Sequence, residues 1–229
     1  MGLPPLVEPG PPLTAEQAER YARHVSLAGL GRLAQRRLLG ARVLVVGAGG
    51  LGSPVLLYLA AAGVGTLGVV DHDVVDLSNL QRQVLHGSAD VGRPKVDTAR
   101  EGVARLDQAV TVHVHPVRLD ASTALETLAG YDVVVDATDN FPARYLLDDA
   151  CALLGLPLVW GSIHQHDGQV TVFWADPPAG HPGVTYRDVF PEAPAPGTVP
   201  SCAEAGVLGA LCGTIGSLMA SEVVKLVTG

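Results

Sequence analysis

The chain has little cysteine, lysine or aromatic content. Its 229 residues include three cysteines and two lysines, beside thirteen arginines, and aromatic residues make up 4%. An odd number of cysteines in a chain of this length argues against a disulfide scaffold. The net charge of −8 argues against nucleic acid or an anionic membrane as a main partner.

Long hydrophobic runs are also missing. Glycine, proline or a charged residue interrupts every run before the roughly 18 apolar residues of a membrane-spanning helix. Residues 1–13 are rich in proline and glycine and lack the basic and apolar pattern of a signal peptide, so we expect a loose arm there. With 48% hydrophobic residues, the chain can form one sizeable core. We therefore expect a single cytoplasmic domain over residues 1–229.

The most informative stretch is residues 42–71. An apolar run at 42–46 is followed by Gly-x-Gly-x-x-Gly at 47–52, an Ala- and Leu-rich helix to about residue 62, and a second apolar run at 66–70 that leads into Asp71. Strand, glycine-rich turn, helix, strand and acid in this order are typical of the βαβ unit that binds nucleotides.

Each glycine of this turn has a predicted task. Gly47 permits the tight turn, Gly49 and Gly50 let the backbone approach a phosphate, and Gly52 lets the helix pack closely on the strand. The helix N-terminus offers unpaired N–H groups to an anion. Asp71 is placed to accept hydrogen bonds from ribose hydroxyls. A glycine turn without a ligand is the alternative.

The rest of the chain alternates between helical and strand patterns. Thr14 and Gln17 have the spacing of a capping box at the start of a helix to about residue 27. Further helices are expected at 33–39, 94–106, 122–130, 141–154, 204–212 and 214–227, and further strands at 110–114, 131–136, 156–163 and 170–174. This order predicts an α/β fold with a doubly wound, mainly parallel, Rossmann-like sheet, N-terminal helices and a C-terminal antiparallel extension after a turn at Gly168. Residues 176–201 form a Pro-rich crossover loop.

Three motifs identify a family. They are Ser78-Asn79-Leu80-Gln81-Arg82-Gln83, Gly92-Arg93-Pro94-Lys95 and Asp136-Ala137-Thr138-Asp139-Asn140. In order and spacing they resemble the ATP-dependent activating enzymes related to ubiquitin-activating enzyme, most closely the bacterial MoeB and ThiF adenylyltransferases. The resemblance runs from about residue 16 to residue 228.

The resemblance implies that a carboxylate attacks the α-phosphate of ATP, giving an acyl adenylate and pyrophosphate. Such a carboxylate is already ionised at neutral pH, so the protein must supply charge neutralisation and alignment rather than a general base. By this resemblance Arg82, Lys95 and Arg23 are the cations, and Asp139 is the magnesium carboxylate. Asn79 and Gln83 are neutral donors to phosphate or ribose. Asp73 either assists or braces its loop.

The resemblance also implies partners. Arg23 is expected to reach the ATP site of a neighbouring subunit in a homodimer, with a solvated helix charge as the alternative. The substrate is expected to be the Gly-Gly tail of a small ubiquitin-like β-grasp protein of the MoaD or ThiS kind. A sulfur donor such as a cysteine desulfurase or rhodanese would convert the activated tail to a thiocarboxylate for molybdopterin, thiamin or tRNA thiolation.

Cysteine usage departs from the family in one respect. Cys202 aligns with a cysteine that some relatives use for a covalent adduct, and its position before a helix favours the thiolate. Cys151 and Cys212 are predicted core residues. Relatives hold zinc with two Cys-x-x-Cys pairs, but here Thr185-Tyr186-Arg187-Asp188 stands at the first pair and the chain ends at Gly229 before the second. We therefore expect no structural zinc, and the pairs His113/His115 and His164/His166 lack the cysteines that would suggest another metal site.

Two other readings stay open. An NAD-dependent oxidoreductase would explain the glycines and Asp71, but would leave Asn79, Arg82, Lys95 and Asp139 without a task. A divergent relative, either a non-catalytic scaffold or a tRNA-modifying dehydratase, would explain the missing cysteine pairs.

Overall fold

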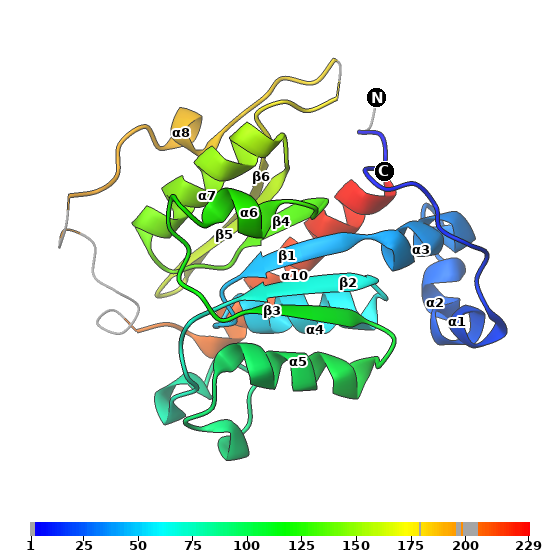
Figure 1. Ribbon diagram of the computed structural model, residues 1–229, viewed down its shortest axis with the longest axis horizontal. Coiled ribbons are helices and arrows are strands. Elements are labelled where there is room, and N and C mark those ends of the chain that lie inside the picture. The colour runs from blue at the N-terminus through cyan, green and yellow to red at the C-terminus, as the bar shows by residue number, and fades with distance from the viewer. Residues whose placement is uncertain (1–2, 179, 196–197, 199–205) are drawn as a thin grey trace.

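The protein has three layers, with a six-stranded sheet between two sets of helices (Figure 1). The computed structural model describes residues 3–178, 180–195, 198 and 206–229. The strands are β1 (Arg42–Val46), β2 (Thr66–Val70), β3 (Thr111–His115), β4 (Val133–Asp136), β5 (Leu158–His164) and β6 (Asp167–Phe173). The helices are α1 (Ala15–Arg20), α2 (Ala22–Val25), α3 (Gly31–Gly40), α4 (Gly52–Ala61), α5 (Lys95–Leu106), α6 (Ala124–Leu128), α7 (Phe141–Leu154), α8 (Tyr186–Val189) and α10 (Gly209–Thr228), with 3₁₀ turns η1 (Leu77–Asn79) and η2 (Ser88–Asp90).

The strand order places a ligand crevice at the middle of the sheet. The order is β3-β2-β1-β4-β5-β6, with every neighbouring pair parallel except β5 and β6. Between β1 and β4 the direction of winding reverses, and sheets of this kind bind ligands beyond the carboxyl ends of the strands at such a point. The predicted α/β fold, with its parallel sheet and antiparallel extension, is confirmed.

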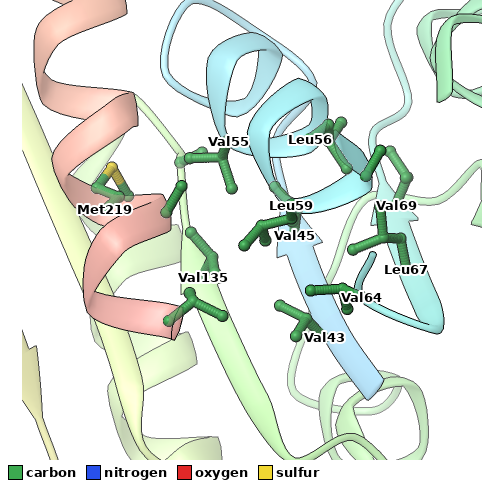
Figure 2. Packing of buried hydrophobic residues seen from close by; sticks show 14 of the residues in the cluster. Val43, Val45, Val55, Leu56, Leu59, Val64, Leu67, Val69, Val135 and Met219 are labelled. Carbon is green, nitrogen blue, oxygen red and sulfur yellow. The ribbon is translucent and has the colours of Figure 1, made fainter. Parts of the chain in front are cut away.

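Alternate residues of each central strand belong to different cores. Val43 and Val45 of β1 lie in the hydrophobic cluster that α4, α5 and α10 cover. Figure 2 shows Val45 beside Leu59 of α4, and Val43 beside Val64. Leu44 and Val46 lie in the second cluster, under α6 and α7. Because both faces are covered, these strands read as continuous apolar runs rather than as alternating ones.

The N-terminal segment differs from the expected loose arm. From Leu3 onward the described part of the arm lies along the body of the protein, and Leu3, Leu6 and Val7 pack against the core. The N–H of Leu6 donates to the carbonyl of Leu226 at 3.1 Å, and Arg37 Nε donates to the carbonyl of Val7 at 3.1 Å. Apolar residues between the prolines thus dock the arm on α3 and α10.

The C-terminal helix is longer than expected. α10 is one 20-residue helix where two helices separated near residue 213 were predicted, and it is long and apolar enough to cross a membrane by length and composition, with a mean hydropathy of 1.4. Its glycine at 216 lies where a Cβ would meet the carbonyl oxygen of Leu51. The helix packs on α4 and β5, and Met219, Val223 and Val227 are fully buried. In this structure α10 is therefore a core helix.

Three smaller boundaries also differ from expectation. The capping box of Thr14 and Gln17 is present, but the predicted first helix divides into α1 and α2 at Tyr21. The hairpin turn between β5 and β6 falls at residues 165–166, and Gly168 lies within β6, paired with Ile163. Ile215 of α10 occupies the space that a side chain at Gly168 would fill. The Pro-rich crossover loop contains the helix α8.

Candidate functional site

A cavity of about 1320 Å³ lies at the carboxyl ends of β1, β2 and β4. Its walls include the glycine-rich turn after β1, the residues after β2, the start of α5 and the loop that follows β4. The sequence-predicted site residues that line it are Gly47, Gly49, Gly50, Asp71, Asp73, Arg82, Gln83, Lys95 and Asp139. Residues from both sides of the switch point therefore meet in one site.

The glycines of the turn divide into two kinds. Gly47 has a φ of +98°, and a Cβ there would lie 2.7 Å from the carbonyl oxygen of Ala137. A Cβ on Gly52 would collide with the carbonyl oxygen of Gly47, so both glycines close the turn against its surroundings. A Cβ on Gly49 would have only an ordinary contact, 3.7 Å from Gln83 Nε2. Gly49 therefore faces space that a ligand can enter.

Asp71 is bound to the turn. One of its carboxylate oxygens accepts a hydrogen bond from the N–H of Ala48 at 2.8 Å, and the other accepts from the N–H of Asp73 at 2.9 Å. A carboxylate oxygen can accept more than one hydrogen bond, so these bonds orient Asp71 and leave capacity for ribose hydroxyls.

Lys95 is a buried cation at the start of α5. Its side chain is 7% exposed, and Nζ donates to Asp73 Oδ2 at 2.8 Å. The hydrogen bond from Lys95 holds the pKa of Asp73 below its ordinary value, although desolvation opposes the shift. Asp73 is thus the counter-ion of the buried ammonium.

The Ser78–Gln83 segment contributes two of its three predicted polar residues to the cavity. Arg82 extends over Gly50, with its Cγ and Cδ 3.5 Å from where a Cβ on that glycine would stand, and its Nη1 donates to the carbonyl of Ser78 at 3.2 Å. Gln83 is buried, and its Oε1 has no hydrogen-bond partner among the described residues. Asn79 instead caps η1, where its Oδ1 accepts from the N–H of Asp76 at 3.2 Å.

Asp139 is an exposed carboxylate in the loop between β4 and α7. Thr138 before it is fixed by Asp136, whose Oδ1 accepts from the backbone N–H of Thr138 at 2.9 Å and from its hydroxyl at 2.6 Å. Asn140 after it caps α7 through a bond from the N–H of Ala143 at 3.0 Å. Hydrogen bonds thus fix the residues on either side of Asp139, whose carboxylate is an oxygen ligand of the kind that Mg²⁺ prefers. Mg²⁺ takes one or two protein carboxylates and completes its coordination shell with phosphate and water.

Two predicted residues lie elsewhere. Arg23 is exposed on α2, outside the set of described residues that line the cavity. Its neighbour Arg20 is engaged within the chain, because Arg20 Nε pairs with Asp107 Oδ2 at 2.9 Å. Cys202 lies outside the described residues. Cys151 and Cys212 are buried, as predicted.

Sequence reasoning missed two parts of the cavity wall. One is the loop at residues 117–120, which follows β3 and could have been found from the rule that ligands bind at the carboxyl ends of strands. The other is an aromatic compartment around Arg144, whose guanidinium lies 5.2 Å from the ring of Phe141 and 5.7 Å from that of Trp160. Of the ten aromatic residues six gather there: Phe141, Tyr145, Trp160, Phe173, Tyr186 and Phe190. Their sequence positions give no signal of this.

The resemblance places a Cys-x-x-Cys zinc pair at residues 185–188, and the residues present there do not fit a metal. The Thr185 hydroxyl and backbone N–H both donate to Asp188 Oδ2 at 2.8 Å, and the N–H of Asp188 donates to Thr185 Oγ1 at 3.3 Å. These two side chains are hydrogen-bonded to one another and present no thiolate. Arg187 then makes a bidentate ion pair with Asp149 of α7, both bonds 2.7 Å long. A hydrogen-bonded box thus closes the turn, and an ion pair anchors α8.

Comparisons with known proteins find a matching family model and similar proteins over nearly the whole chain. The model of the ThiF family matches residues 21–229. The probable adenylyltransferase/sulfurtransferase MoeZ of Mycobacterium tuberculosis is 56% identical over 227 residues, which are 99% of this chain and 58% of that protein. The sulfur carrier protein adenylyltransferase of Thermus thermophilus is 54% identical over 216 residues, which are 94% of this chain and 80% of that protein.

Solved structures show the same fold. PaaA superposes with a TM-score of 0.77 at 25% identity, over 95% of this chain and 67% of that one. E. coli MccB in a complex with AMPCPP and MccA gives a TM-score of 0.79 at 19% identity, over 94% of this chain and 64% of that one. The chain spans 58% of MoeZ and 48% of the mouse adenylyltransferase and sulfurtransferase MOCS3, to which it is 49% identical.

Proposed function

Since this chain belongs to the ThiF family, as the three motifs indicated, we propose that it is an ATP-dependent adenylyltransferase for a small ubiquitin-like sulfur-carrier protein. The substrate class comes from the relatives, two of which are named a sulfur carrier protein adenylyltransferase and a SAMP-activating enzyme E1. The alternative of an NAD-dependent oxidoreductase has no support in these names.

The residues of the cavity suit the demands of the reaction. The triphosphate of ATP would lie over Gly49, where the backbone is open, and beside Gly50, over which Arg82 extends. Arg82 and Lys95 would be the fixed cations. These cations neutralise the charge that otherwise keeps the C-terminal carboxylate of the carrier away from the α-phosphorus. A carboxylate oxygen then forms a bond to phosphorus, and pyrophosphate leaves with the electron pair of the broken P–O bond. Asp71 and Gln83 would hold the ribose and the phosphates.

Asp139 would hold Mg²⁺ together with the phosphates. When bound, this ion supplies charge neutralisation at the leaving pyrophosphate. Asp139 lies at the end of β4, across the switch point from the glycine-rich turn, so its carboxylate faces the same cavity as the cations.

The remaining parts of the proposal concern other chains. Arg23 is exposed on α2, as a residue that enters the site of a second subunit of a homodimer would be. Cys202 would form the covalent adduct, and a desulfurase or rhodanese would supply sulfur to the activated tail. The pathway would be molybdopterin, thiamin or tRNA thiolation.

The observation that carries the proposal is the convergence of Lys95, Arg82 and Asp139 on one cavity beside the glycine-rich turn. A dinucleotide-binding turn alone does not require these charges. The test is pyrophosphate release from Mg-ATP when a β-grasp protein ending in Gly-Gly is added. Carrier-dependent release that disappears when the Gly-Gly tail is deleted supports the proposal. If no pyrophosphate is released, and NADH absorbance changes when an oxidisable or reducible substrate is added, the protein is an oxidoreductase and the proposal is wrong.

A further inference from the structure

Next to the cavity, outside its lining, lies a buried histidine that the sequence motifs did not single out. His86 is 6% exposed and follows the Ser78–Gln83 segment by three residues. Its Nε2 lies 3.0 Å from the carbonyl oxygen of Ala48 in the glycine-rich turn, and its Nδ1 lies 2.8 Å from Thr98 Oγ1 on α5. One ring thus touches the two elements between which the triphosphate would lie.

These two bonds complete a circuit between the glycine-rich turn and Lys95, in which the helix α5 itself is one link. From Ala48 the circuit runs through its N–H to Asp71, and Asp71 accepts from the N–H of Asp73. Asp73 accepts from the backbone N–H of Lys95 at 3.0 Å and from Nζ of the same residue at 2.8 Å.

The second half of the circuit returns to the turn. Thr98 lies on α5, three residues after Lys95, and its hydroxyl contacts His86, which contacts the carbonyl of Ala48. Ala48 is therefore held at both its N–H and its C=O. The circuit ties the peptide next to Gly49 to the residue that carries the buried ammonium.

The ring's protonation state follows from its partners. A carbonyl oxygen only accepts hydrogen bonds, so Nε2 carries the proton and the unprotonated Nδ1 accepts from the Thr98 hydroxyl. Burial lowers the pKa of His86, while its bond to Ala48 opposes that shift, and the charged groups that act on the ring are Lys95, Asp90 and Asp71. At pH 7 the ring is therefore uncharged, and its two nitrogens connect the turn to α5.

We infer that His86 is a positioning residue for ATP binding, which sets the separation between the glycine-rich turn and Lys95. The inference rests on the proposed function, because the turn and Lys95 matter together only if a phosphate chain spans them. Leu85, next to His86, also packs closely against α5. A Cβ added to Gly102 of α5 would lie only 2.6 Å from Leu85 Cδ1. Through Leu85 and His86, the Arg82–His86 segment packs between the glycine-rich turn and α5.

The test is calorimetric binding of a non-hydrolysable ATP analogue with Mg²⁺ to the full chain. His86→Leu keeps the bulk but removes the donor to Ala48, and we expect Kd for the analogue to rise about tenfold, because the buried Ala48 carbonyl loses its partner and the turn relaxes. His86→Gln can present its amide N–H at the place of Nε2 and should stay within about threefold of the wild type. Equal Kd values for His86→Leu and wild type would overturn the inference.

A second pair of variants covers a failure of His86→Leu to fold. Thr98→Val has the same shape without the hydroxyl and should weaken binding severalfold, whereas Thr98→Ser should restore it. The readout that a merely structural role would not move is coupling: in a Lys95→Met background, His86→Leu should add little to Kd, because the residue that it positions is gone. Full additivity in that cycle would overturn the inference. A wild-type protein that does not bind the analogue would instead refute the proposed function.

Discussion

Gly49 and Gly52 are three residues apart, but we expect opposite consequences from the same substitution. The structure allows a side chain at Gly49, where φ is not positive and a Cβ would have an ordinary 3.7 Å contact with Gln83 Nε2. Gly49→Ala should therefore leave the free energy of unfolding unchanged or raise it by up to about 1 kcal/mol, because alanine restricts the unfolded chain. At Gly52 the Cβ would collide with the backbone oxygen of Gly47. Gly52→Ala should cost about 1–3 kcal/mol or more, since backbone atoms cannot move aside as a flexible side chain can.

Ligand binding reverses the ranking of these variants in the folded protein. The methyl group of Gly49→Ala would stand where the triphosphate approaches, so Kd for ATP should rise at least about tenfold, or about 1.4 kcal/mol. Chemical denaturation measures the stability of each variant, and calorimetric titration with Mg-ATP measures the affinity. Wild-type affinity in Gly49→Ala would show that the phosphates do not pass over this residue. Wild-type stability in Gly52→Ala would refute the close packing of the turn.

Three further predictions concern single charges and the zinc position. Lys95→Met should lower the rate of ATP–pyrophosphate exchange by about 100-fold or more, because a fixed cation is lost from the site, and an exchange rate near that of wild type would contradict this role. Because the folded-state pKa of Asp73 is lowered by Lys95, its contribution to stability is present above its ordinary pKa of 3.8 and is lost as the pH falls through the folded value. The stability difference between wild type and Asp73→Asn, followed by urea unfolding from pH 7 to pH 2, should therefore shrink at the acid end, and a constant difference would exclude the ion pair. A strong zinc chelator should leave Tm unchanged, and a fall in Tm would contradict an anchor of α8 without metal. Tyr186→Ala should lower the free energy of unfolding by about 3–5 kcal/mol, by analogy with buried Phe→Ala, because a fully buried ring is removed from the aromatic compartment.

The parts of the fold that could be predicted are those whose signal is local. The strand at residues 66–70 has the expected bounds, because an apolar run covered on both faces can be read without its neighbours. The glycine-rich turn and Asp71 are local in the same sense, since their spacing follows from a single βαβ unit. Arg82, Lys95 and Asp139 were placed in the site by motifs rather than by physical argument, and the structure brings them to one cavity.

The parts that could not be predicted depend on contacts between distant segments. His86 is 38 residues from Ala48 and 12 residues from Thr98, and nothing around it in the sequence marks it as a bridge. The helix α8 forms inside a Pro-rich stretch because partners on α7, such as Asp149, hold it. The arm at the N-terminus docks for the same reason. Asn79 caps the 3₁₀ turn η1 and does not line the cavity, because its side chain accepts from a backbone N–H three residues away.

The most direct test of the central claim is mass spectrometry of a small β-grasp protein ending in Gly-Gly after incubation with this chain and Mg-ATP. We expect the carrier to gain the mass of one adenylyl group (AMP less one water), located by fragmentation at its terminal glycine. It should lose this group when hydroxylamine is added, as an acyl adenylate does. The Lys95→Met variant should form this adduct at least about 100-fold more slowly. Failure of the wild-type protein to adenylate any of a set of MoaD- and ThiS-like carriers that a known ThiF-family enzyme modifies under the same conditions would contradict the claim.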